Sequence, residues 1–96
     1  MNNVLETIDK EGNKIYMSQE RWKHILRHPH MHNGIEAIQK TLKNPTTTRH
    51  FEQDKKVRHF YKEFKQSEPS EKYLLVVVKY LNGSGFIITG LKWKLI

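Results

Sequence analysis

Four histidines lie close together in the stretch RWKHILRHPHMH, and each could carry a proton or bind a metal ion. The chain has no cysteine, which excludes disulfides and thiolate metal ligands. His24 and His28 are one helical turn apart, and helical periodicity places them on one polar face with Arg21. Imidazoles beside a guanidinium suit acid–base chemistry on a phosphodiester; the alternative interpretation is a solvated helix face.

The same stretch could also form a zinc site. The pair at helical spacing could supply two ligands, or His28, His30 and His32 could supply three. However, the glutamate of an HExxH motif is absent, and a third ligand for the pair would have to come from His50, His59 or a carboxylate. HPHMH also lies in a turn after a helix that a proline ends. We therefore expect no metal and no cofactor.

A second group of polar residues lies in VRHFYKEF and near the end of the chain. Strand alternation places His59 and Tyr61 on one face, and Arg58 and Lys62 on the other. Arg58 and Tyr61 would meet one ligand only if the strand twists, bulges or presents them at its end. Thr89 could bind a phosphate through its hydroxyl, or it could simply fill a β-branched strand position.

Two helices followed by four strands must position these residues. One helix is expected over SQERWKHILRH, capped by Ser18 and ended by Pro29. A second is expected over GIEAIQKTLKN, capped by Asn33 and ended by Pro45. From TTTRHFE onward the apolar period changes to two, through VRHFYKEF, KYLLVVVKYL and GFIITGLKW. The predicted fold is α+β, with two N-terminal helices packed on a four-stranded antiparallel meander and a short N-terminal hairpin or arm.

Length and charge limit the class of protein. The 96 residues suit one domain, residues 1–96. The net charge of +7 favours RNA or an acidic protein as partner, and the basic residues are interleaved with rings that can stack on bases. We expect no signal peptide, no membrane segment and a cytoplasmic location, because no basic run precedes an apolar block and no apolar run approaches ~20 residues.

The order of these motifs resembles the small nucleases grouped as phage-barnase-EndoU-colicin-RelE-like (PBECR-type). The similarity covers roughly residues 20 to 92: RWKHILRHP, a second helix ending in NP, VRHFYK, YLLVVVKY and GFIITG. It implies a BECR-like fold and metal-independent RNA cleavage, often by a toxin that an antitoxin holds inactive. It implies catalytic positions at His24, His28, Arg58, Tyr61 and Thr89. The chain departs from the pattern at His30, where an acidic residue would follow HP.

The sequence therefore predicts a metal-independent endoribonuclease, the toxin of a toxin–antitoxin pair, that cleaves RNA by attack of the ribose 2′-hydroxyl. One of the two helical histidines would act as base and the other as acid, with Arg58 stabilising charge and Tyr61 or Thr89 positioning phosphate. The expected RNA-binding residues are Arg21, Arg49, His59, Lys62 and Lys92. The alternatives are a non-catalytic RNA- or DNA-binding module, and an interaction domain that docks an acidic protein.

Overall fold

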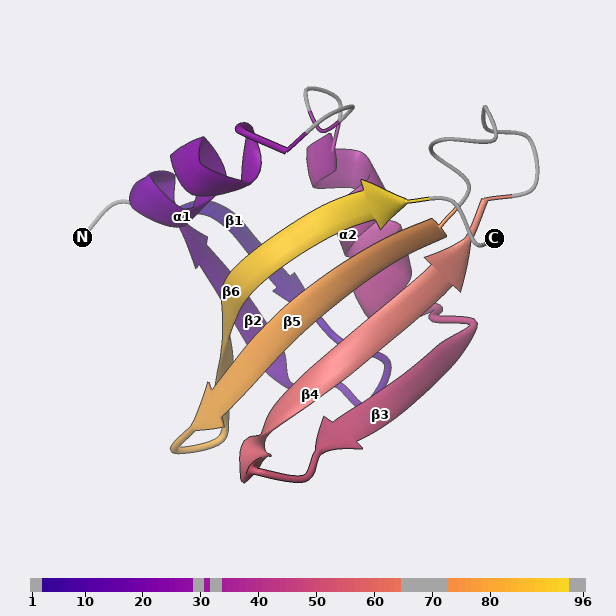
Figure 1. The fold of residues 1–96 in the computed structure, drawn as a ribbon. Helices are drawn as coiled ribbons and strands as arrows, with labels where there is room; N and C mark the ends of the chain where they lie inside the picture. The colour runs from indigo at the N-terminus through magenta and orange to yellow at the C-terminus, as the bar shows by residue number, and fades with distance from the viewer. Residues whose placement is uncertain (1–2, 29–30, 32–33, 65–72, 94–96) are drawn as a thin grey trace.

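The fold is built on a six-stranded sheet with two helices on one of its faces (Figure 1). The computed structural model describes residues 3–28, 31, 34–64 and 73–93. The strands lie in the order β1-β2-β6-β5-β4-β3 across the sheet. The elements are β1 (Asn3–Ile8), β2 (Lys14–Ser18), α1 (Gln19–Ile25), α2 (Gly34–Lys43), β3 (Thr47–Phe51), β4 (Asp54–Glu63), β5 (Tyr73–Leu81) and β6 (Ser84–Trp93).

The prediction of two helices on a four-stranded meander was wrong, because the N-terminal hairpin belongs to the same sheet. Strands β3 to β6 pair antiparallel, and β2 extends the sheet beyond β6 by a parallel pairing that sets Tyr16 opposite Phe86. This pairing buries Ile15 and Met17, so the hairpin contributes its apolar face to the core. Alternation within the hairpin indicated extended chain, but a period of two does not specify which strand edge the hairpin joins.

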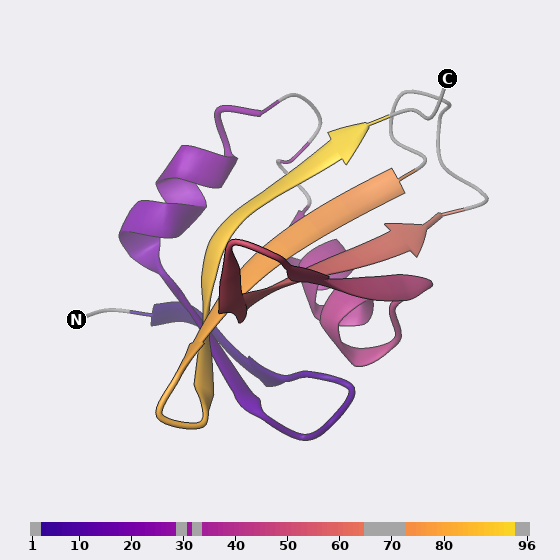
Figure 2. The same cartoon turned by 60° about the horizontal axis from the view of Figure 1, so that its bottom comes forward.

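Both helices cover the same face of the sheet, and α2 lies behind β4 and β5 in Figure 1. Figure 2, turned toward the lower edge, shows α1 beside β6 and α2 beneath the sheet. The predicted start of α1 is confirmed, since Ser18 Oγ accepts a 3.1 Å hydrogen bond from the Arg21 amide. The predicted Asn33 cap lies outside the described residues.

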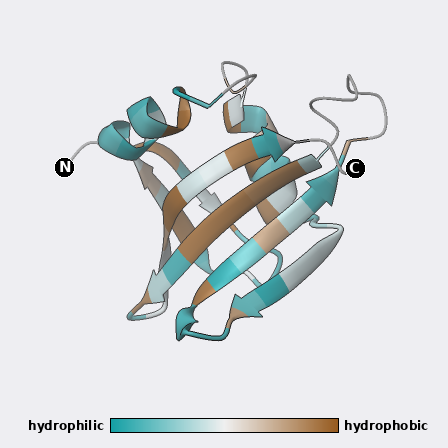
Figure 3. Cartoon of the chain, in the orientation of Figure 1, coloured by the Kyte–Doolittle hydropathy of each residue, from teal (hydrophilic) through white to brown (hydrophobic). Residues whose placement is uncertain are grey.

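The core fills the space between the helices and the sheet. β5 lies between β4 and β6 and appears as a continuous apolar band in Figure 3. Its residues Leu74, Val76 and Val78 are fully buried, whereas Leu75 and Val77 on the opposite face are half-buried. The core side chains are Leu5, Ile15, Met17, Ile25, Met31, Ile38, Leu42, Phe60, Leu74, Val76, Val78 and Ile87. The face turned away from both helices, which we call the open face, therefore carries apolar residues that no described element covers.

Local irregularities on β6 set which of its side chains reach the open face. The β5–β6 hairpin turns at Asn82 and Gly83, both with positive φ, which fits the twist of a tight two-residue hairpin. Further along, a register shift leaves one extra residue on β6: Lys79 faces Phe86, but Val77 faces Thr89. Phe86 and Thr89 are three residues apart, so regular alternation would separate them. The bulge puts both on the open face.

In the described part of the chain, neither helix has the length and apolar character needed to cross a membrane.

Candidate functional site

A row of four residues crosses the open face at right angles to the strands. Arg49 on β3 pairs with His59 on β4, His59 pairs with Val77 on β5, and Val77 pairs with Thr89 on β6. Directly opposed residues point to the same side of a sheet, so this row aligns a guanidinium, an imidazole and a hydroxyl. Three residues predicted from the sequence are thereby brought onto one surface from three different strands.

Tyr61 adds a second hydroxyl beside the imidazole. Its oxygen lies 3.4 Å from His59 Nδ1, a hydrogen-bond contact in which the donor depends on the imidazole tautomer. On the other side, the ring of Phe51 stacks on the imidazole, with centroids 5.6 Å apart and an interplanar angle of 18°. The imidazole is therefore held between a hydroxyl and an aromatic face, and a large part of Phe51 remains exposed.

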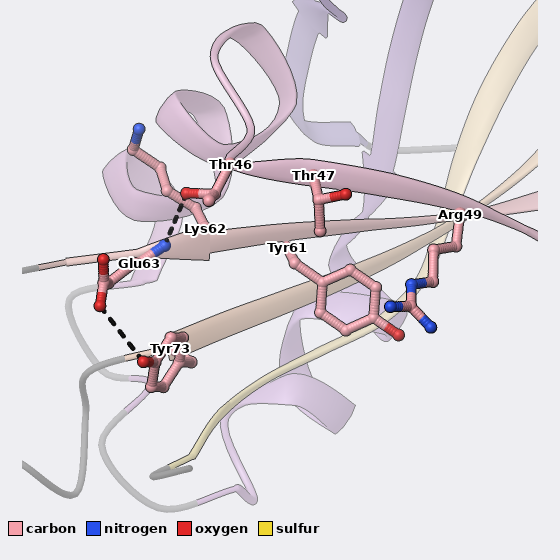
Figure 4. A pocket seen from close by; sticks show the side chains of 7 residues that line it. All are labelled: Thr46, Thr47, Arg49, Tyr61, Lys62, Glu63 and Tyr73. Atoms are coloured by element: carbon pink, nitrogen blue, oxygen red, sulfur yellow. Dashed lines mark hydrogen bonds between the residues drawn. The ribbon is translucent and has the colours of Figure 1, made fainter.

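A hollow of about 340 Å³ adjoins this cluster (Figure 4). In Figure 4 the Tyr61 hydroxyl and the Arg49 guanidinium point to the same end of the hollow. At the other end Tyr73 donates a 3.2 Å hydrogen bond to Glu63 Oε2, and the Glu63 amide donates to Thr46 Oγ1 at 3.0 Å. The hollow is lined by Thr46, Thr47, Arg49, Tyr61, Lys62, Glu63 and Tyr73. The Arg49 end of the hollow lies next to the imidazole, and Lys62 and Glu63 lie toward the other end (Figure 4).

Arg58 points to the opposite side of β4. Its guanidinium forms an ion pair with Glu11 and lies 5.1 Å above the centre of the Tyr80 ring. Tyr80 in turn donates a 2.7 Å hydrogen bond to Asp9 Oδ2. Burial, together with the hydrogen bond to Asp9, raises the pKa of Tyr80 well above its ordinary value. Arg58 thus ties β4 to the β1–β2 hairpin and does not share the surface of His59 and Tyr61.

His24 and His28 form a separate group on and just after α1. Their rings meet edge to face with centroids 6.0 Å apart. Arg21 and Arg27 lie with His24 around a second hollow of about 340 Å³. Because α1 packs on β6, β2 and β1, this group is placed on the helix side, whereas Arg49, His59 and Tyr61 lie on the open face. The predicted catalytic set is therefore divided between two surfaces.

The two remaining basic residues of the predicted RNA-binding set are on the helix side of the sheet. Lys62 and Lys92 both pair with Leu74, a core residue, from opposite neighbouring strands. Lys62 Nζ donates a 2.8 Å hydrogen bond to the Asn44 carbonyl near the end of α2. The Lys62 ammonium is therefore hydrogen-bonded to the backbone near the end of α2.

The described residues do not form a ligand set for a zinc ion. Among residues 3–28, 31, 34–64 and 73–93, no three histidine, aspartate or glutamate side chains gather closely enough to hold a metal ion. His30 and His32 lie outside the described residues.

Sequence reasoning missed three aromatic residues of the open face. Phe51 stacks on His59, and Phe86 stacks on Tyr16 with ring centroids 5.8 Å apart. The available signal for Tyr16 was alternation in KIYMS, which buries Ile15 and Met17 and so turns Tyr16 outward. Phe86 carried no such signal relative to Thr89, because the bulge on β6 interrupts the alternation between them.

Comparison of the chain with protein-family models, curated proteins and solved structures finds no match. The resemblance to PBECR-type nucleases consequently rests on the motifs in this sequence.

Proposed function

We propose that the protein is a metal-independent endoribonuclease that binds and cleaves RNA on the open face of its sheet. The observation that carries the proposal is that His59 contacts Tyr61 and pairs across the sheet with Arg49, and that Tyr61 and Arg49 line one hollow. A phosphodiester cleavage site needs a proton acceptor, a proton donor and a cation for the phosphorane, and these side chains supply one group of each kind.

The cleavage step uses the RNA itself as the nucleophile. His59 accepts the proton of the ribose 2′-hydroxyl as that oxygen attacks the adjacent phosphorus. The bond from phosphorus to the 5′ oxygen breaks, and that oxygen takes a proton from the Tyr61 hydroxyl. The protonated imidazole then returns a proton to Tyr61 across their 3.4 Å contact. The products are a 2′,3′-cyclic phosphate and a 5′-hydroxyl.

Arg49 would contact the reacting phosphate, and Thr89 would contact a neighbouring one. The guanidinium can neutralise the charge that develops on the phosphorane, and two parallel N–H bonds suit a phosphate oxygen pair. Thr89 lies two strands from His59 in the same row, on the order of 10 Å away at ordinary strand spacing. That separation assigns its hydroxyl to a neighbouring phosphate rather than to the reacting one.

His24 and His28 remain predicted catalytic residues in a second possible centre. Two imidazoles 6.0 Å apart could act as base and acid, and arginines lie beside them. We favour the open face because its imidazole already contacts a hydroxyl on its own strand and an aromatic ring from β3, whereas the His24–His28 pair comes from one short helix and the residues just after it.

Two other parts of the predicted function belong to the same proposal. The net charge of +7 fits an acidic protein that covers the site, as the antitoxin of a toxin–antitoxin pair would, and such a nuclease would act in the cytoplasm. A non-catalytic RNA-binding module is the alternative that the exposed aromatic rings favour. Turnover of RNA separates the two functions.

The test is cleavage of a single-stranded RNA by the purified chain in excess EDTA. We expect fragments that end in a 2′,3′-cyclic phosphate, and no cleavage at a position where the ribose is replaced by 2′-deoxyribose. Cleavage at the deoxy position, products with a 3′-hydroxyl, or activity that needs an added divalent ion would each contradict the proposed mechanism.

A further inference from the structure

We propose that the open face binds RNA as an extended single strand, with one base stacked on Phe86 beside Tyr16 and another on Phe51 beside His59. The inference rests on the proposed function, since it names the form of RNA that the site accepts. It assigns a binding role to three aromatic residues that the cleavage step does not use.

The first element is the ring pair formed by Tyr16 and Phe86. The rings are stacked at 5.8 Å with an interplanar angle of 29°, so Tyr16 fixes the orientation of Phe86. Phe86 nevertheless keeps 43% of its surface exposed. A single exposed apolar residue is ordinary, but an aromatic ring braced from one side with its remaining surface in solvent can receive a nucleobase at little entropic cost.

The second element is the ring of Phe51, which is 40% exposed and braced by its stacking on His59. The two braced rings belong to one surface, because Phe51 stacks on His59 and the β6 bulge turns Phe86 to the side of the sheet that carries His59. Strand spacing and rise place Phe86 on the order of 12 Å from His59, two strands across and two residues along. A short stretch of extended nucleotide chain can bridge that separation.

The charges around this surface suit a polyanion. Arg49 and Lys14 are exposed cations near its two ends, and Lys79 beside Phe86 is paired with Asp54 at 3.1 Å, so those two charges compensate each other. Two further carboxylates of the described open face, Glu6 and Glu63, lie at its margins. Between them lie Leu75, Val77, Thr89 and Leu91, which carry no charge. The cations can contact phosphates, and no carboxylate of the described residues lies along the central row.

Unpaired bases are what distinguish this ligand from a duplex. In double-stranded RNA each base is already stacked and paired, so its ring face cannot reach an aromatic side chain. A sheet with braced aromatic rings therefore selects single strands, and base–aromatic stacking tolerates any base. The affinity for RNA should therefore depend little on which base stacks on Phe86.

The test measures binding separately from cleavage. A fluorescein-labelled 12-nucleotide 2′-O-methyl RNA, which lacks the attacking hydroxyl, is titrated with wild-type protein and with Phe86→Leu and Phe86→Trp. Leucine keeps an apolar side chain but removes the flat ring, so we expect affinity for the single strand to fall about tenfold or more. Tryptophan keeps a stacking face and should bind at least as well as the wild type. The same oligonucleotide annealed to its complement should bind weakly and equally to all three proteins.

Several results would overturn the inference: unchanged single-strand affinity in Phe86→Leu, equal losses on single strand and duplex, or a change of oligomeric state that shows this face to be covered by a second copy of the chain. Thermal unfolding of each variant identifies any loss caused by misfolding, and Phe51→Leu then repeats the test at the second ring. If the wild type cleaves RNA but Phe86→Leu binds normally, only this inference fails. If ring-dependent binding holds but the wild type never cleaves, the proposed cleavage fails while the RNA-binding surface stands.

Discussion

The Tyr80 hydroxyl donates a 2.7 Å hydrogen bond to the Asp9 carboxylate, 71 residues earlier in the chain. Asp9 is only 3% exposed and also accepts bonds from the amides of Glu11 and Asn13 and from the Asn13 side chain. One carboxylate therefore organises the β1–β2 turn and fastens it to β5. This contact is one reason that the N-terminal hairpin is part of the sheet and not a separate arm.

Replacing Tyr80 with phenylalanine should lower the free energy of unfolding by roughly 1 to 3 kcal/mol, because a buried carboxylate loses a hydrogen bond that water cannot easily replace. Urea unfolding followed by tryptophan fluorescence measures the loss. Tyr73→Phe is the matched control: its hydroxyl also donates to a carboxylate, but at 3.2 Å, and its partner Glu63 is only half-buried. A smaller loss is expected there, and equal losses would contradict the buried role of Asp9.

Protonation of the Asp9 carboxylate should lower the stability of the protein in acid. Burial alone would raise the pKa of this carboxyl, but the hydrogen bonds from Tyr80, Asn13 and Glu11 outweigh it and hold the pKa below its ordinary value. A depressed folded-state pKa stabilises the protein above the unfolded pKa of ~3.9, and that stabilisation is lost as pH falls through the folded value. The stability difference between wild type and Asp9→Asn should thus shrink from pH 6 to pH 3. A stability difference that grows in acid would contradict a lowered pKa for Asp9.

Arg58 should prove structural rather than catalytic. Arg58→Ala removes the ion pair with Glu11 and the contact with the Tyr80 ring, with an expected loss of about 1 to 2 kcal/mol in unfolding free energy. Lys40→Ala, which breaks an exposed pair with Glu36 on α2, should change stability by less than ~0.5 kcal/mol. Cleavage by folded Arg58→Ala should stay within a few-fold of the wild type. A loss of ~10² at a temperature where the variant is fully folded would return Arg58 to the active site.

The sequence indicated the separate elements better than their assembly. Ser18 as helix cap and LLVVV as an interior strand follow from local chemistry and hydrophobic period, and both are present in the structure. The parallel pairing of β2 with β6 joins residues seventy positions apart in the chain, and neither segment carries a local signal for it. The same holds for the bulge that turns Phe86 and Thr89 to one side.

For the site, alternation correctly put His59 with Tyr61 and separated both from Arg58. From the sequence, however, we assigned the acid and base roles to His24 and His28. Four histidines in one stretch are a conspicuous pattern, and a single histidine on a strand is not. The contacts of His59 with Phe51 and of Arg49 with the Tyr61 hollow come from β3, a neighbour that periodicity within one strand cannot reveal.

An acidic protein partner should compete with RNA for the open face. Its carboxylates would take the place of phosphates near Arg49, so binding should slow as salt rises. Co-expression with the adjacent reading frame, followed by pull-down at low and high salt, measures this. Arg49→Glu should abolish capture while Arg21→Glu on α1 leaves it intact; the reverse pattern would place the partner on the helix side.

Single-turnover cleavage of one single-stranded RNA in EDTA, compared between His59→Ala and His24→Ala, distinguishes a cleavage site on the open face from one on α1. Both substitutions remove one imidazole from the surface and leave the core side chains in place, and thermal unfolding confirms that each variant is folded. We expect His59→Ala to slow cleavage by ~10² or more, the scale expected for loss of a general base, while His24→Ala stays within a few-fold of the wild type. Full activity in His59→Ala with a large loss in His24→Ala would contradict it and move the cleavage site to α1.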